Sequence, residues 1–78
     1  MPDLAVDFMD MTDDGRLLTT LVDARPGFVP AVGMHVVIGD DGAEPAVAHV
    51  LAVDAEGVVE LQVLPGPVDS HRGLLAPI

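Results

Sequence analysis

The close spacing of turn signals constrains the fold of this chain more than any other feature of its sequence. Turn-forming groups recur along it, at Asp13-Asp14-Gly15, Arg25-Pro26-Gly27, Gly39-Asp40-Asp41-Gly42, Ala55-Glu56-Gly57 and Pro65-Gly66-Pro67. These residue types favour turns because they supply left-handed backbone, a fixed φ or a local hydrogen bond. The runs between the turns are rich in valine and leucine, and short strands at this spacing are typical of an all-β barrel or sandwich.

Five segments fit this pattern and are expected to form strands. They are residues 4–11, 16–22, 34–38, 46–54 and 58–64. The last segment alternates most clearly, with Val59, Leu61 and Val63 on one face and Glu60 and Gln62 on the other. Because successive side chains of a strand point to opposite faces, the three apolar residues are expected to lie in the core.

The first segment also has helical character. Leu4, Phe8 and Met11 recur at the spacing of one helix face. However, the turn at residues 13–15 leads directly into residues 16–22, as in a hairpin. A hairpin needs a strand on both sides of its turn, so a strand over residues 4–11 is the favoured prediction and a helix is the alternative.

Together the five segments predict one small domain over residues 1–78. Five short antiparallel strands in a meander indicate a small barrel of the SH3-like kind, with an OB-like barrel as the alternative. Residues 33–64 resemble such barrels, because Gly33 precedes a strand and acidic, glycine-containing turns join the next two. This resemblance concerns an architecture and implies no function.

The tail of the chain lacks the alternation of the strands. Residues 67–75 are expected to form a short helical turn, which Asp69 or Ser70 would cap and Gly73 would end. The apolar pair Leu74 and Leu75 would then pack on an end of the barrel or on a neighbouring molecule.

Charge excludes several classes of partner. Thirteen acidic residues face three arginines, there is no lysine, and the formal net charge is −10. Such a charge repels phosphate backbones, so direct binding to nucleic acid or to an anionic membrane is not expected. The acids instead suit a basic protein partner, or they keep an apolar chain in solution. With no cysteine, no signal-peptide pattern at its start and no apolar run of membrane-spanning length, a cytoplasmic location is expected.

The apolar content predicts self-association. Half of the residues are hydrophobic, although Phe8 and Phe28 are the only aromatic ones. A domain of this size buries only about 60% of the surface of its unfolded chain, and apolar surface that stays uncovered commonly marks an interface. We therefore expect a homo-oligomer, most simply a dimer. The candidate interface residues are Phe28, Val37, Leu51, Leu64, Leu74 and Leu75.

No residue pattern predicts catalysis or a cofactor. Asp69, Ser70 and His71 are triad residue types, but neighbours in sequence point apart, and a working triad is assembled from distant positions. The doublets Asp13-Asp14 and Asp40-Asp41 fall in expected turns, where aspartate is favoured for structural reasons. The chain also lacks the glycine patterns of phosphate-binding loops. The chain is expected not to be an enzyme, and no catalytic residue is assigned.

Two of the three histidines stand at the ends of one expected hairpin. If Ile38 pairs near residues 45–47, His35 lies opposite or beside His49, with Cβ atoms about 4.5–5.5 Å apart. Two imidazoles at that distance could share a metal ion, but a protein zinc site needs a third or fourth ligand, which His71 or an aspartate would have to supply. A pH-sensitive interface and a plain exposed pair are the other interpretations, and no metal is assigned.

Three functions follow, from three different classes. The first is a non-enzymatic protein-interaction or structural module that is acidic and self-associating. The second is an acidic inhibitor that imitates nucleic acid, which predicts acids gathered on one face rather than scattered among turns. The third is a small metal-binding protein that uses His35 and His49.

Overall fold

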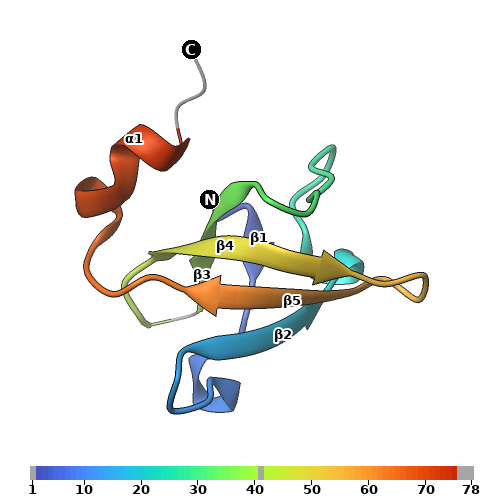
Figure 1. Cartoon of the computed structure of the whole chain (residues 1–78), viewed down its shortest axis with the longest axis horizontal. Coiled ribbons are helices and arrows are strands. Elements are labelled where there is room, and N and C mark those ends of the chain that lie inside the picture. The colour runs from blue at the N-terminus through green and yellow to red at the C-terminus, as the bar shows by residue number, and fades with distance from the viewer. Residues whose placement is uncertain (1, 41, 76–78) are drawn as a thin grey trace.

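A computed structural model describes residues 2–40 and 42–75 of the chain; Asp41, part of one predicted aspartate doublet, lies outside the described residues. The strands are β1 (Leu4–Ala5), β2 (Arg16–Thr20), β3 (His35–Gly39), β4 (Ala46–Val53) and β5 (Val58–Val63). Single turns of 3-10 helix form η1 (Phe8–Asp10), η2 (Leu21–Asp23) and η3 (Val68–His71), and η3 runs into a short α1 (Arg72–Leu75). Figure 1 shows these elements, with α1 beside the sheet.

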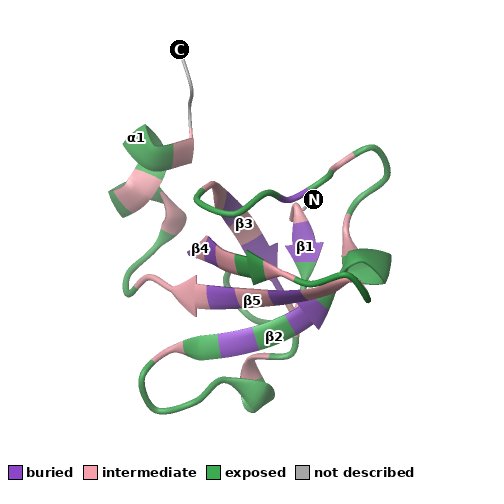
Figure 2. Cartoon of the chain, turned by 45° about the vertical axis from the view of Figure 1, so that its right-hand side comes forward, coloured by how far each residue is buried: buried purple, intermediate pink, exposed green. Residues whose placement is uncertain are grey.

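The strands form one mixed sheet in the order β1-β3-β4-β5-β2. Neighbours from β3 to β5, and β5 with β2, pair antiparallel, whereas β1 pairs parallel with β3. The sheet curls into a half-barrel, with its edge strands β1 and β2 at the two ends of the curl (Figure 2). This architecture confirms the predicted small all-β, five-stranded fold with a short C-terminal helical turn.

The prediction for residues 4–11 is wrong in its extent and in its pairing. Only Leu4–Ala5 is strand, and Phe8–Asp10 is a 3-10 turn whose start is capped by the Asp7 carboxylate, which accepts a hydrogen bond from Met9 N at 2.9 Å. No hairpin joins this segment to β2. The local cap interrupts the strand, so neither a full strand nor a full helix forms.

The parallel pairing of β1 corrects the expectation of a wholly antiparallel sheet, and Asp3 is its physical reason. One oxygen of the Asp3 carboxylate accepts from Val37 N at 3.0 Å, and the other accepts from Arg25 Nε at 2.9 Å. These bonds hold the start of the chain beside β3, and Leu4 then lies opposite Ile38. These hydrogen bonds join residues that are far apart in sequence, so they cannot be predicted from a local pattern.

The core is a single apolar layer on the inner face of the sheet. Its buried members are Leu4, Leu17, Val36, Ile38, Ala48, Val50, Val59 and Leu61. The alternation predicted for β5 is confirmed, since Val59 and Leu61 are fully buried and Val63 is half-buried against them. Within the described residues, every buried side-chain nitrogen or oxygen has a hydrogen-bond partner.

The tail covers part of the outer face. The segment from η3 to α1 packs against β3 and β4, and Val47, which points outward, is fully buried there. The predicted helical turn is confirmed, but its predicted ends are wrong. Pro67 precedes η3 without a side-chain cap, and Gly73 lies inside α1. None of the helices in the described ranges is long and apolar enough to cross a membrane.

Candidate functional site

The β3–β4 hairpin brings His35 and His49 together, a register that the sequence left open. They are direct register partners, and their rings stack with centroids 4.8 Å apart and planes inclined by 29°. Both side chains are half-buried on the outer face of the sheet. The neighbouring pair Val36 and Ala48 points into the core, which settles on which face the histidines lie.

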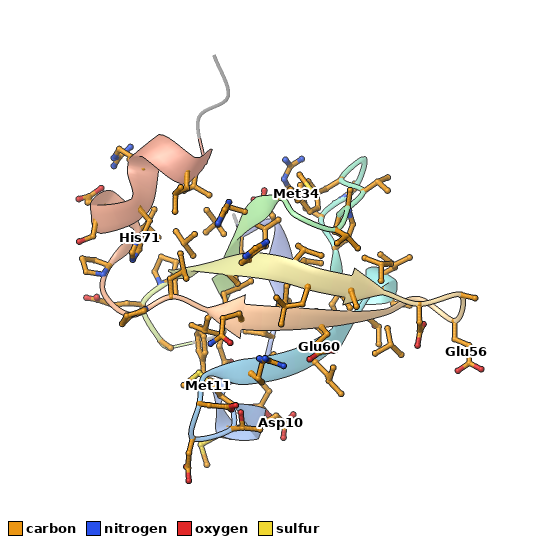
Figure 3. The ribbon with its side chains drawn as sticks, viewed as in Figure 1. Asp10, Met11, Met34, Glu56, Glu60 and His71 are labelled. Atoms are coloured by element: carbon orange, nitrogen blue, oxygen red, sulfur yellow. The ribbon has the colours of Figure 1, made fainter. Side chains whose placement is uncertain are left out.

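The third histidine lies on the same side of the molecule, in η3. His71 Nε2 is 2.7 Å from the carbonyl oxygen of Pro65, which accepts its hydrogen. The bond therefore links the loop at Pro65 to η3. Figure 3 places His71 at the side of the sheet that carries α1. His71 is near enough to His35 to affect its protonation.

The stacked arrangement does not form a chelating pair in this geometry. Ring nitrogens donate to a metal within the plane of the ring, and two nearly parallel rings direct their nitrogens along similar lines rather than to one point. A zinc ion also needs ligand nitrogens at about 2.0–2.1 Å and usually three or four ligands. Among residues 2–40 and 42–75, no three histidine or acidic side chains are grouped so as to hold a metal ion.

The histidine pair predicts a pH-dependent stability. Burial, helped by the imidazoles of His49 and His71, lowers the pKa of His35 below its ordinary value of 6.5. The unfolded chain therefore binds more protons than the folded chain just below that pH. The free energy of unfolding is therefore highest above pH 6.5 and decreases as the pH falls through the folded-state pKa of His35. Urea unfolding at a series of pH values would measure it.

The control for this prediction is the variant His35→Gln, which keeps a polar side chain but cannot titrate. We expect its free energy of unfolding to fall less than that of the parent chain between about pH 6.5 and about pH 5.5. Equal slopes for the two proteins would show that His35 does not cause the effect.

Asp69 and His71, the acid and base of the apparent triad, bond to groups other than Ser70. The Asp69 carboxylate pairs with the Arg72 guanidinium, and His71 bonds to the Pro65 carbonyl. Neither partner is therefore set against Ser70, which is exposed. The geometry supplies no activated hydroxyl at this position.

A polar row crosses the outer face from the histidines to the edge of the sheet. Register places Gln62 beside His49 and opposite Arg16. Arg16 Nε donates to Gln62 Oε1 at 2.8 Å, and Arg16 Nη1 donates to a Glu60 oxygen at 2.9 Å. The charge of Arg16 is therefore paired with Glu60 of the same chain.

The outer edge of β2 is unpaired. The ladder to β5 is fixed by bonds from Val63 N to Gly15 O and from Leu21 N to Gly57 O, at 2.8 and 2.9 Å. In an antiparallel ladder alternate residues bond to one neighbour, so Leu17 and Thr19 bond to β5 while Leu18 and Thr20 direct their backbone groups away from it. Within the described ranges, no hydrogen bond reaches the outward backbone groups of Leu18 or Thr20.

Two hollows lie along this edge and share Asp10 and Leu18. One, of about 610 Å³, is lined by Asp10, Thr12, Asp14, Arg16, Leu17, Leu18 and Glu60. The other, of about 310 Å³, is lined by Ala5, Val6, Asp7, Asp10, Leu18, Thr19, Thr20 and Asp23. We call this pair of hollows the β2 groove. Carboxylates dominate its charged lining.

The predicted interface residues lie in several environments. Leu74 is 50% exposed on α1, and Val37, Leu51, Leu64 and Leu75 are half-buried on or beside the outer face. Phe28 is separate from them. It packs against the edge of the core, and the Arg25 guanidinium lies 4.9 Å above its ring.

Other exposed apolar residues were not among the predicted interface positions. Met9, Met11, Leu18, Leu21, Val22, Val29 and Val32 are each at least 40% exposed. The exposure of Leu18 can be predicted from the alternation of the strand. Because Leu17 and Thr19 face the core, strict alternation sends Leu18 outward. Figure 2 shows buried and exposed residues alternating along β2. The sequence gives no such indication for Leu21 and Val22 in η2, because the predicted strand runs on to residue 22 and does not end at Thr20.

No protein-family model, curated protein or solved structure matches this chain.

Proposed function

We propose that this protein is a non-enzymatic interaction module that forms a homodimer. One observation carries the proposal: large apolar side chains remain exposed although the inner face of the sheet is already filled. On the outer face, Leu74 is 50% exposed, and Leu51, Leu64 and Leu75 are only half-buried. A single core under a half-barrel cannot cover them, and a second molecule can.

The tail face is the surface that best suits a second copy. We define it as Val37, Leu51, Leu64, Leu74 and Leu75. It joins the outer face of β3 and β4 to the C-terminal turn, which already packs there. The bulge between Val50 and Ala52 leaves both Leu51 and Ala52 outside the core layer, so apolar surface continues along β4.

Charge favours the tail face over the β2 side. Each copy carries a net charge of −10, so two copies repel each other wherever unpaired acids meet. Asp7, Asp10, Asp13, Asp14 and Asp23 form no ion pair with the described residues, and all belong to the segment around β2. At the tail face Asp69 is neutralised by Arg72, and fewer of the described acids without an ion pair border it, namely Asp40 beside Val37 and Glu44 beside Leu64.

The proposed dimer predicts a specific effect of Leu74. Sedimentation equilibrium over a dilution series should give a mass near twice the 8.1 kDa of one chain. Leu74→Glu would place a charge in the interface and should raise the dissociation constant at least tenfold, or by about 1.4 kcal/mol. A chain that stays monomeric at every concentration would contradict the proposal.

The matched control is Val22→Glu. It adds the same charge to the same protein at a side chain that is more exposed than Leu74 but lies away from the tail face. We expect its dissociation constant to stay close to that of the parent chain. If Val22→Glu dissociates the dimer and Leu74→Glu does not, the copies associate through the η2 surface instead.

A further inference from the structure

We infer that the β2 groove binds an extended, basic segment of a partner protein, which adds to the sheet as a strand beside Leu18 and Thr20. The inference rests on the proposed function as an interaction module and names a partner, and a surface other than the tail face, for it. It has three independent supports, which are the unpaired backbone, the space beside it and the charge around it.

The backbone support is the free edge itself. Leu18 and Thr20 each present one N–H and one C=O away from β5, and these groups repeat with the spacing that a further strand requires. At Arg16 the same side is already closed, because Arg16 N donates to Thr12 Oγ1 at 3.0 Å and Thr12 N donates to Arg16 O at 2.9 Å. The open stretch therefore begins at Leu18.

The space support is the pair of hollows that meet at Asp10 and Leu18. A partner backbone that lies in them would run between β2 and the segment after β1. Near Thr19 the two sides are joined by a side chain rather than by a ladder, since Thr19 Oγ1 donates to Ala5 O at 2.9 Å, and an added strand would displace this one bond. The half-barrel thus keeps a seam where β strands of the same chain do not pair.

The charge around the β2 groove indicates which kind of segment it binds. The β2 groove is lined by Asp7, Asp10, Asp14, Asp23 and Glu60, against the single cation Arg16. The hydrogen bond from the Thr12 hydroxyl lowers the pKa of Asp14, so that carboxylate is ionised at neutral pH. A segment with lysine or arginine at alternate positions would neutralise these acids, whereas a second copy of this chain would bring five more of its own.

Side chains would set the register of the added strand. Leu18 is 61% exposed on the outer face and offers an apolar contact to the partner residue opposite it. In strand addition the main-chain bonds supply affinity, and alternate side chains supply specificity. The expected partner segment therefore alternates basic and apolar residues.

The direct test is amide hydrogen exchange by NMR, with a short synthetic peptide of alternating lysine and valine as the probe. Leu18 and Thr20 amides should exchange rapidly in the free protein and at least about tenfold more slowly with saturating peptide, because the new strand would bond to them. Leu17 and Thr19 amides, which already bond to β5, should change little. Binding without protection of Leu18 and Thr20 would overturn strand addition.

Two peptide controls separate the backbone from the charge. A peptide with the same sequence but with alternate amides N-methylated keeps its charge and cannot form the ladder, so it should bind much more weakly. A glutamate–valine peptide keeps the ladder but repels the acids, so it should not bind. Equal binding of the N-methylated peptide would reduce the interaction to charge alone and overturn the inference.

A matched pair of protein variants locates the site. Asp10→Lys and Glu56→Lys change the net charge equally, but Asp10 lines the groove and Glu56 lies in the distant turn after β4 (Figure 3). Asp10→Lys should weaken peptide binding by about fivefold or more, and Glu56→Lys by less than about twofold, since screening limits distant charges. Equal effects of the two variants would mean that the peptide responds only to net charge.

Failure of this inference can be told apart from failure of the proposed function. Sedimentation of the same samples reports the dimer independently of the peptide. A dimer that does not bind the peptide would overturn the inference and leave the homodimer standing. A monomer that protects Leu18 and Thr20 on adding the peptide would support the inference and remove the homodimer.

Discussion

Replacing Leu61 with alanine is expected to lower the free energy of unfolding by about 3 kcal/mol. Leu61 lies on the central axis of the core, fully buried, with Leu17 opposite it on β2 and Val50 opposite it on β4. The backbone ladders on both sides prevent the strands from closing around the cavity, so most of the lost contact stays lost. A domain of this length has about 4–12 kcal/mol of stability in total, so the loss is a large part of it.

The control is Leu18→Ala, one residue from Leu17 on the adjacent strand and 61% exposed. It removes the same atoms from a site that is already open to solvent, and should change stability by less than about 0.5 kcal/mol. Urea unfolding of both variants measures the difference. A similar loss for both would mean that Leu18 is covered in solution, as a partner or second copy on β2 would cause.

Replacing Gly15 with alanine is expected to cost about 2 kcal/mol. Gly15 has φ +83°, where a side chain is strained by about 1 kcal/mol. An added Cβ would also lie 2.8 Å from Gln62 Nε2 and 3.3 Å from the Val63 carbonyl oxygen. Gln62 would have to leave its 2.8 Å bond to the Asp14 carbonyl, and a lost hydrogen bond adds about 1 kcal/mol.

Gly27→Ala separates the two contributions at Gly15. Gly27 has a similar φ of +81°, but an added Cβ there has no neighbour within 4 Å. It should therefore show only the backbone strain, about 1 kcal/mol. Thermal or urea unfolding of the pair isolates the contact with Gln62. If Gly27→Ala costs as much as Gly15→Ala, the bond from Gln62 to the Asp14 carbonyl contributes nothing to stability.

The arginines show how the acidic charge is distributed. Each of the three pairs with an acid, namely Arg16 with Glu60, Arg25 with Asp3 and Arg72 with Asp69. The first two join segments distant in sequence, and the third closes one helical turn. With its arginines engaged in this way, the chain leaves the acids around β2 to interact with an external cation.

Local pattern was sufficient for most of the sheet. The alternation in β5 predicted its two faces because side chains in a strand must alternate, whatever the strand packs against. The turn between β3 and β4 predicted a hairpin, but only the structure shows that His35 faces His49, because the loop between Gly39 and Ala46 permits more than one register. Turn residues also bounded β4 and β5 to within one residue of the observed ends.

The N-terminal segment shows where local pattern fails. Both periodicities were present in residues 4–11, and the outcome was decided by the Asp3 bonds to Val37 and Arg25 and by the Asp7 cap. Two of these bonds connect parts of the chain more than twenty residues apart. Propensity within a short window cannot register a partner that arrives only on folding.

The sequence by itself therefore determined the strand-rich class, the inward face of the central strands and the excess of negative charge. Tertiary structure alone decided that β1 runs parallel to β3, that β2 pairs with β5 and keeps an open edge, and that the acids of residues 7–23 gather beside it. The physical reason is the separation in sequence of the residues that interact. Alternation and turns are set by neighbours a few residues apart, whereas an unpaired edge is defined by which distant strand occupies the other side.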